Sequence, residues 1–106
     1  MKPAVREILT EFRHGLEEIY GPRLAGLILF GSQAREDAVG DSDINVMVLL
    51  HGDVSPLQEA HRISRFRGDL CLRYRVVVTC IYMSLDEALA ADSPLLQNVR
   101  AEGVAV

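Results

Sequence analysis

Residues 24–50 have the sequence LAGLILFGSQAREDAVGDSDINVMVLL, in which two apolar runs flank a polar connector. The first run, Leu24–Phe30, contains no polar side chain, and the second, Ile44–Leu50, has Asn45 as its single polar member. Runs of this length and composition fit strands that are covered on both faces of a sheet. We therefore expect two central strands, and the polar connector between them is the candidate for function.

Helices are predicted on both sides of these strands. Residues 4–20 carry apolar side chains at helical spacing with charged side chains on the opposite face. Gly21-Pro22 should end that helix, because proline disfavours helical geometry at the residue before it. After the second strand, Ser55-Pro56 should begin a helix that runs to about Leu72, with Gln58 closing a capping box on Ser55.

The last third of the chain supplies one more strand and two short helices. Arg75–Met83 is rich in valine and predicts a third buried strand. A capping box at residues 84–87 and a Ser-Pro pair at residues 93–94 should start the helices, and Gly103 should end the second one before the apolar tail Val104–Val106. This order predicts an α/β (α+β) fold, a small mixed three-stranded sheet with flanking helices, in one domain over residues 1–106.

Composition narrows the class of protein. The chain has 106 residues, 49% of them apolar and 25% charged, which is typical of one folded domain. The net charge of −4 argues against general nucleic-acid binding, although a local basic patch stays open. No apolar run approaches the roughly 20 residues that cross a bilayer, and the first residues lack a signal peptide's apolar core. We expect a cytoplasmic protein with no membrane partner.

The polar connector suits phosphate and metal chemistry. Gly31 has no side chain, so its backbone can approach a triphosphate, and Ser32 with nearby N–H groups can donate hydrogen bonds to phosphate oxygens. Residues two apart in a strand face the same way, so Asp43 and Asn45 would present two oxygen ligands side by side to Mg²⁺.

These residues resemble the signature of the DNA polymerase β-like nucleotidyltransferase superfamily, which is Gly-Ser, ten residues and then Asp-x-Asp. Ten residues separate Ser32 from Asp43 here. The sequence SPLLQNVRAEG at residues 93–103 is similar to the end of short stand-alone members, the minimal nucleotidyltransferases (MNT). The resemblance implies a nucleotidyltransferase fold, with ATP or another nucleoside triphosphate as substrate and Mg²⁺ as cofactor. It assigns phosphate binding to Gly31, Ser32 and Arg35, and catalysis and metal binding to Asp43 and Asn45.

The acidic positions depart from that family's pattern. Asn45 stands where the second aspartate is expected, and a neutral amide is a poorer ligand for a hard divalent cation than a carboxylate. The third acid should come from the neighbouring strand, at Val76 or Val78, and residues 74–80 contain no acidic side chain. Asp41 and Asp69 are the acids that could substitute. Glu36 stands where a glycine is common, so it could repel incoming phosphates.

Two functions remain open on this basis. As an enzyme, the chain would transfer a nucleotidyl group, with AMP from ATP the first candidate, to a hydroxyl of a protein or small molecule. As a binding module, it would act by association with a partner protein. The resemblance implies a helical HEPN-domain toxin as that partner, with this chain as its antitoxin. The sequence identifies neither the acceptor nor the oligomeric state, and a homo-oligomer is left open.

The remaining polar clusters have simpler interpretations. Five arginines on and after the second long helix could bind an acidic partner or RNA, but a solvated helix face is the favoured interpretation: they are Arg62, Arg65, Arg67, Arg73 and Arg75. Cys71 and Cys80 lack metal-binding spacing and are expected to be reduced core thiols. The three histidines, His14, His51 and His61, are scattered along the chain and form no ligand pair.

Overall fold

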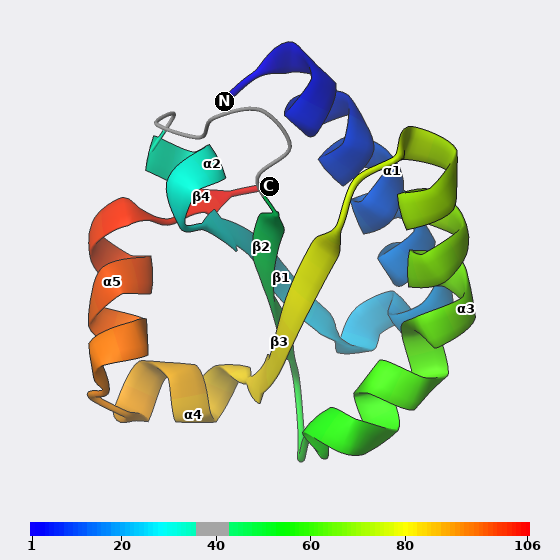
Figure 1. Ribbon diagram of the computed structural model, residues 1–106. Coiled ribbons are helices and arrows are strands. Elements are labelled where there is room, and N and C mark those ends of the chain that lie inside the picture. The colour runs from blue at the N-terminus through cyan, green and yellow to red at the C-terminus, as the bar shows by residue number, and fades with distance from the viewer. Residues whose placement is uncertain (36–42) are drawn as a thin grey trace.

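The computed structural model describes residues 1–35 and 43–106. Four of its strands form one mixed sheet in the order β3-β2-β1-β4 (Figure 1). The central strands are β1 (Leu24–Phe30) and β2 (Ile44–Leu50), which are antiparallel to each other. β3 (Val78–Ser84) lies parallel to β2 at one edge, and β4 (Val104–Ala105) lies antiparallel to β1 at the other. The predicted α+β class is confirmed.

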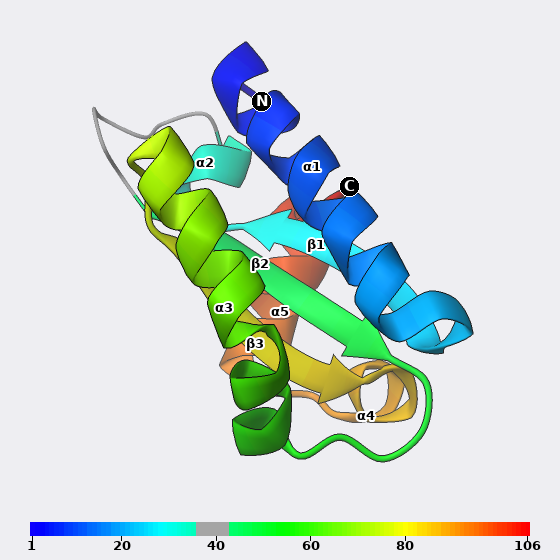
Figure 2. The same cartoon turned by 90° about the vertical axis from the view of Figure 1, so that its right-hand side faces the viewer.

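Helices cover both faces of this sheet. Figure 2 shows α1 (Pro3–Tyr20) and α3 (Pro56–Tyr74) on one face, with α4 (Leu85–Ala90) and α5 (Pro94–Glu102) on the other. A 3-10 turn, η1 (Gly21–Arg23), leads into β1, and a single helical turn, α2 (Ser32–Arg35), follows it. The long helices α1 and α3 cover the larger of two apolar cores, and the short helices cover the smaller.

Alternation along the strands divides the apolar side chains between these cores. The α1/α3 face of the sheet carries the first set: Leu27, Leu29, Val46, Val48, Val78 and Tyr82. The α4/α5 face carries the second: Ile28, Met47, Leu49, Ile81 and Met83. Because successive residues of a strand point to opposite faces, one register fixes which side chains can meet.

The two long helices approach each other closely over the sheet. Phe12 of α1 stacks on Phe66 of α3, with ring centroids 5.6 Å apart and planes within 5° of parallel. Gly15 lies against the same ring, and a Cβ at that position would overlap the ring carbons of Phe66. The glycine therefore admits the aromatic stack that joins α1 to α3.

A buried carboxylate joins α1, η1 and α3 at the opposite end of the sheet from the connector. Glu59 is only 1% exposed, and it accepts hydrogen bonds from Tyr20 Oη at 2.8 Å and from Arg62 Nε at 2.9 Å. Arg23 Nη1 lies 3.3 Å from its second oxygen. Burial alone would raise the pKa of Glu59, but the bonds from Tyr20 and Arg62 and the charges of both arginines lower it below its usual 4.5.

The structure corrects the expected third strand. Residues 75–77 were predicted to belong to it, but α3 continues to Tyr74 and the strand begins at Val78. Arg75 occupies the left-handed region, with φ of 54°, and its N–H bonds the carbonyl of Cys71 as the helix cap. The bounds predicted for β1 and β2 are confirmed.

The sheet also has one strand more than predicted. Val104 and Ala105 pair with Leu29 and Ile28, so the apolar tail forms an edge strand. Arg13 Nη1 donates to the Val106 carbonyl at 2.5 Å and holds the tail against α1. A strand of two residues is too short to show alternation in a sequence, which explains why it was missed.

Helix caps follow the sequence in two of the three predicted places. Ser84 Oγ accepts from Glu87 N at 3.1 Å, and Ser93 Oγ accepts from Leu96 N at 3.2 Å. Ser55 makes no such side-chain bond, so the capping box predicted there is wrong.

Within residues 1–35 and 43–106, no helix has both the length and the apolar character needed to cross a membrane.

Replacing Glu59 by glutamine should lower the free energy of unfolding by about 2 kcal/mol at neutral pH, because bonds to a charged acceptor become bonds to a neutral one. The pKa of Glu59 is depressed in the folded state, so its contribution is full above 4.5 and is lost as pH falls through the folded pKa. Wild type and variant should therefore converge in acid, as measured by urea unfolding across pH. Glu17→Gln, which removes the carboxylate of an exposed ion pair with Arg13, is the control and should change stability little. Parallel pH profiles for wild type and Glu59→Gln would contradict this role.

Candidate functional site

The connector begins where β1 and β2 lie side by side. Phe30, the last residue of β1, pairs with Asn45 of β2. Gly31 follows with φ of 81°, a conformation that residues with a Cβ rarely adopt. A Cβ on Gly31 would lie 2.8 Å from the Asn45 side-chain nitrogen. The absence of a side chain at residue 31 thus allows the Asn45 amide to pack against the backbone turn.

Gly31 and Ser32 form a tight strand-to-helix turn. The Gly31 carbonyl accepts from the N–H groups of Ala34 and Arg35, each at 3.1 Å, and Ser32 opens α2 with a partly exposed side chain. Arg35, at the end of that turn, donates from Nη1 to Glu102 Oε2 of α5 at 2.9 Å. A phosphate that bound Arg35 would therefore compete with Glu102.

Asp43 and Asn45 lie at the start of β2. Asp43 is exposed and directly precedes the strand, and the ladder extends to this point through the bond from Ile44 N to the Val77 carbonyl at 2.9 Å. Asn45 shares strand parity with Met47, so both belong to the α4/α5 face. If the alternation of β2 extends one residue to Asp43, that carboxylate belongs to the same face as Asn45.

The register of β3 overturns the expected position of the third acid. Ile44 pairs with Val78, and Asn45 pairs with Thr79. Val78 is fully buried on the α1/α3 face, and Val76 packs against the same core before the strand begins. Neither position faces Asn45, so both predictions were wrong. Thr79 is exposed and shares a face with Asn45 at the spacing of neighbouring strands, about 4.8 Å.

The resulting set of side chains is a poor match to a two-metal centre. Asp43, Asn45 and Thr79 offer one carboxylate, one amide and one hydroxyl, whereas hard divalent cations favour several carboxylates. Across residues 1–35 and 43–106, no three acidic, histidine or cysteine side chains come together as metal ligands. Asp69 lies on α3, which covers the other face of the sheet, and Asp41 lies outside the described residues.

Comparison with known proteins identifies the family. The model of the nucleotidyltransferase domain family matches residues 9–93, a span that contains β1, the connector, β2, α3 and β3. This chain belongs to the nucleotidyltransferase family. Among curated proteins it is similar to two from Methanocaldococcus jannaschii. It is 32% identical to "Putative protein adenylyltransferase MJ0141" over 71% of this chain and 75% of the relative. It is 34% identical to "Putative protein adenylyltransferase MJ0604" over 72% and 70%.

Solved structures support the nucleotidyltransferase fold. A chain of a toxin–antitoxin complex with AMP-PNP superposes with a TM-score of 0.62 at 20% identity, over 90% of this chain and 69% of that one. A chain of the complex between tri-AMPylated HEPN toxin and MNT antitoxin from Shewanella oneidensis gives 0.61 at 18% identity, over 94% and 69%. At these identities the likeness shows the fold alone. The short minimal type proposed from the sequence is consistent with both.

Several other polar residues of the nucleotidyltransferase are engaged within the chain. Of the five clustered arginines, Arg62 pairs with buried Glu59, Arg73 pairs with Glu11, and Arg67 donates to the Val78 carbonyl. These bonds favour the structural interpretation of the cluster. The described residues contain two free cysteines, as expected, and burial raises the pKa of the Cys80 thiol to about 11.

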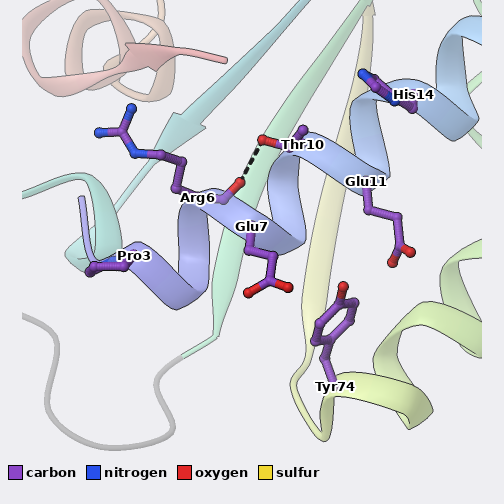
Figure 3. A pocket seen from close by; sticks show the side chains of 7 residues that line it. All are labelled: Pro3, Arg6, Glu7, Thr10, Glu11, His14 and Tyr74. Atoms are coloured by element: carbon purple, nitrogen blue, oxygen red, sulfur yellow. Dashed lines mark hydrogen bonds between the residues drawn. The ribbon is translucent and has the colours of Figure 1, made fainter.

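A hollow of about 540 Å³ lies elsewhere, on the outer side of α1 near the end of α3 (Figure 3). It contains none of the residues predicted for the site. In Figure 3 the side chains of Glu7, Glu11 and Tyr74 converge, while His14 points away. Glu11 is already paired with Arg73. We therefore assign no nucleotide chemistry to this hollow.

The register can be tested with one substitution at two adjacent positions. Thr79→Asp should fold and lose at most about 1 kcal/mol, because the side chain is exposed. Val78→Asp should lose several kcal/mol and unfold the domain, because it buries an unpaired carboxylate. Circular dichroism melting and urea unfolding measure both. Equal stability of the two variants would show that the register is wrong.

Proposed function

We propose that this nucleotidyltransferase acts chiefly as an antitoxin-like binding module, with a degenerate site that transfers nucleotide weakly or not at all. Its partner would be a HEPN-type protein, and its ligand ATP or another nucleoside triphosphate. Both would be met in the cytoplasm. The observation that carries the proposal is the pairing of Asn45 with Thr79 beside Asp43, because it leaves one carboxylate among the three positions.

Charge balance supports the loss of two-metal catalysis. Two divalent cations bring four positive charges, and Asp43 supplies a single negative charge in return among the three side chains. Without the negative charge of a bound triphosphate, uncompensated charge of this size disfavours metal binding at the site. Gly31, Ser32, Asp43 and Asn45 would then remain as a binding site rather than a catalytic one.

The backbone of the site still supports nucleotide binding. The positive φ of Gly31 turns the main chain out of β1, and the first N–H groups of α2 follow this turn. Backbone N–H groups arranged in this way can bind phosphate oxygens without a metal. Arg35 would contribute if the triphosphate displaced Glu102 from it.

Partner association is supported by the structural neighbours. This chain shares its fold with one chain of each of two complexes, which are named as a toxin–antitoxin with AMP-PNP and as a tri-AMPylated HEPN toxin with an MNT antitoxin. A nucleotidyltransferase that binds stoichiometrically needs no complete metal centre. A degenerate site is therefore compatible with an antitoxin that works by contact.

The alternative is an active enzyme that transfers AMP from ATP to a hydroxyl of its partner, with Mg²⁺ as cofactor. The names of the two curated relatives, both protein adenylyltransferases, favour it. It would require an additional carboxylate in place of those missing at residues 45 and 79, and Asp41, outside the described residues, is the candidate for that role.

Labelled ATP with Mg²⁺ and a HEPN-type partner protein would separate the two functions. We expect a stable complex by size-exclusion chromatography and little or no label on either protein. Asp43→Ala should leave complex formation unchanged, because the proposed function does not depend on transfer.

The matched control is Asp53→Ala, an exposed aspartate beyond the other end of β2. Robust labelling by wild type and by Asp53→Ala, together with its loss in Asp43→Ala, would establish the enzyme and refute the binding proposal. Failure to bind the HEPN-type protein would refute the choice of partner.

A further inference from the structure

β3 is an open edge strand. It pairs with β2 on one side, and it is the strand nearest the viewer in Figure 1. In a parallel pair, alternate residues direct both main-chain groups to the partner strand, and the residues between them direct theirs away. Because the Val77 carbonyl accepts from Ile44, the odd-numbered residues face β2 and the even-numbered ones face outward.

Only part of this outer edge is occupied by α3. The N–H of Val78 donates to Cys71 Sγ at 3.4 Å, and its carbonyl accepts from Arg67 Nη1 at 2.9 Å. The outward main-chain groups of Cys80 and Tyr82 have no hydrogen-bond partner in the described part of the chain. They are two residues apart, which is the spacing of one hydrogen-bonding unit in an antiparallel ladder.

The strand also lacks the features that protect an edge. Its seven residues, VTCIYMS, include no charge and no proline, and natural edge strands commonly carry one or the other to prevent pairing. A hollow of about 230 Å³ runs beside it, lined by Ala60, Arg67, Thr79, Cys80 and Tyr82. The hollow leaves room beside the unpaired groups.

We propose that β3 pairs antiparallel with β3 of a second copy of this chain, about a two-fold axis at Ile81. The two four-stranded sheets would become one continuous sheet. Cys80 of each copy would face Tyr82 of the other, so each pair exchanges two main-chain hydrogen bonds. This proposal does not depend on nucleotide binding or on a HEPN-type partner.

The register is self-complementary, as a two-fold interface must be. An axis at Ile81 satisfies the free groups of Cys80 and Tyr82 in both copies at once. Ile81 itself directs its main chain to β2, so the two Ile81 residues form the non-hydrogen-bonded pair. Side chains of such pairs are close, and β-branched apolar residues suit them.

Charges at the two ends of the strand are also complementary. The axis brings Val78 of one copy opposite Ser84 of the other. Arg67 is held at Val78 by its hydrogen bond, whereas exposed Asp86 and Glu87 directly follow Ser84. Arg67 of each copy and the acidic start of α4 in its partner would therefore lie at the same end of the interface, on opposite faces of the joined sheet, twice in the dimer.

The α3 face beside this edge is suited to a close neighbour. A two-fold axis perpendicular to the sheet sets α3 beside its own copy, with Ala60, Ser64 and Gly68 spaced four residues apart on one side. A Cβ at Gly68 would meet no atom within 4 Å, so packing within the chain does not require this glycine. Leu57, on the same helix, is 72% exposed.

Cross-linking tests the axis directly. Under mild oxidation Ile81→Cys should form a disulfide-linked dimer, because the two residues face each other. Thr79→Cys is the control: it is more exposed and on the same face, but in this register it lies opposite Met83 and should not cross-link with itself. Equal cross-linking of both variants, or none for Ile81→Cys, would overturn the proposal.

Charge reversal tests the interface without cysteine chemistry. Sedimentation velocity over a concentration series should show a dimer for wild type, and Arg67→Glu should weaken it roughly tenfold or more. Adding Asp86→Arg and Glu87→Arg to that variant should restore the dimer, whereas Arg6→Glu on α1 should have no effect. A wild-type chain that stays monomeric at every concentration, or a triple variant without recovery, would refute the proposed pairing.

Discussion

The parallel pairing of β2 with β3 is the constraint from which the site and the core both follow. It sets Ile44 beside Val78 and Asn45 beside Thr79. Since successive strand residues point to opposite faces, the first pair enters the α1/α3 core and the second lies on the α4/α5 face. A shift of one residue would expose Val78 and bury Thr79. The apolar core therefore determines which residues of β2 and β3 can belong to the candidate site.

Neutral side chains at two of the three positions change the energetics of the site as well as its chemistry. Three carboxylates on adjacent strands repel one another unless a cation neutralises them. Asn45 and Thr79 remove that repulsion, and the Asn45 amide packs against the Gly31 turn. The folded state then does not require a metal. This property suits a protein that acts by contact better than one that acts by metal-dependent transfer.

The sequence predicted the two central strands and their bounds because both are apolar runs ended by polar residues. It predicted β3 less well, since Arg75 and Val76 have strand-like neighbours but serve as the cap and exit of α3. The position of Thr79 was missed for the same reason, because parity depends on where a strand begins. The contact between Arg35 and Glu102 spans 67 residues and leaves no local pattern to detect.

Metal binding by a restored site is the most direct test of this account. The double variant Asn45→Asp with Thr79→Asp should bind Mn²⁺ roughly tenfold or more tighter than wild type by calorimetry, because three carboxylates would then share one face. The control is Asn45→Asp with Thr10→Asp, which adds the same charge on an exposed site of α1. It should gain less affinity than the Thr79 variant. If both double variants bound Mn²⁺ equally, residue 79 would not belong to the site, and the account would be wrong.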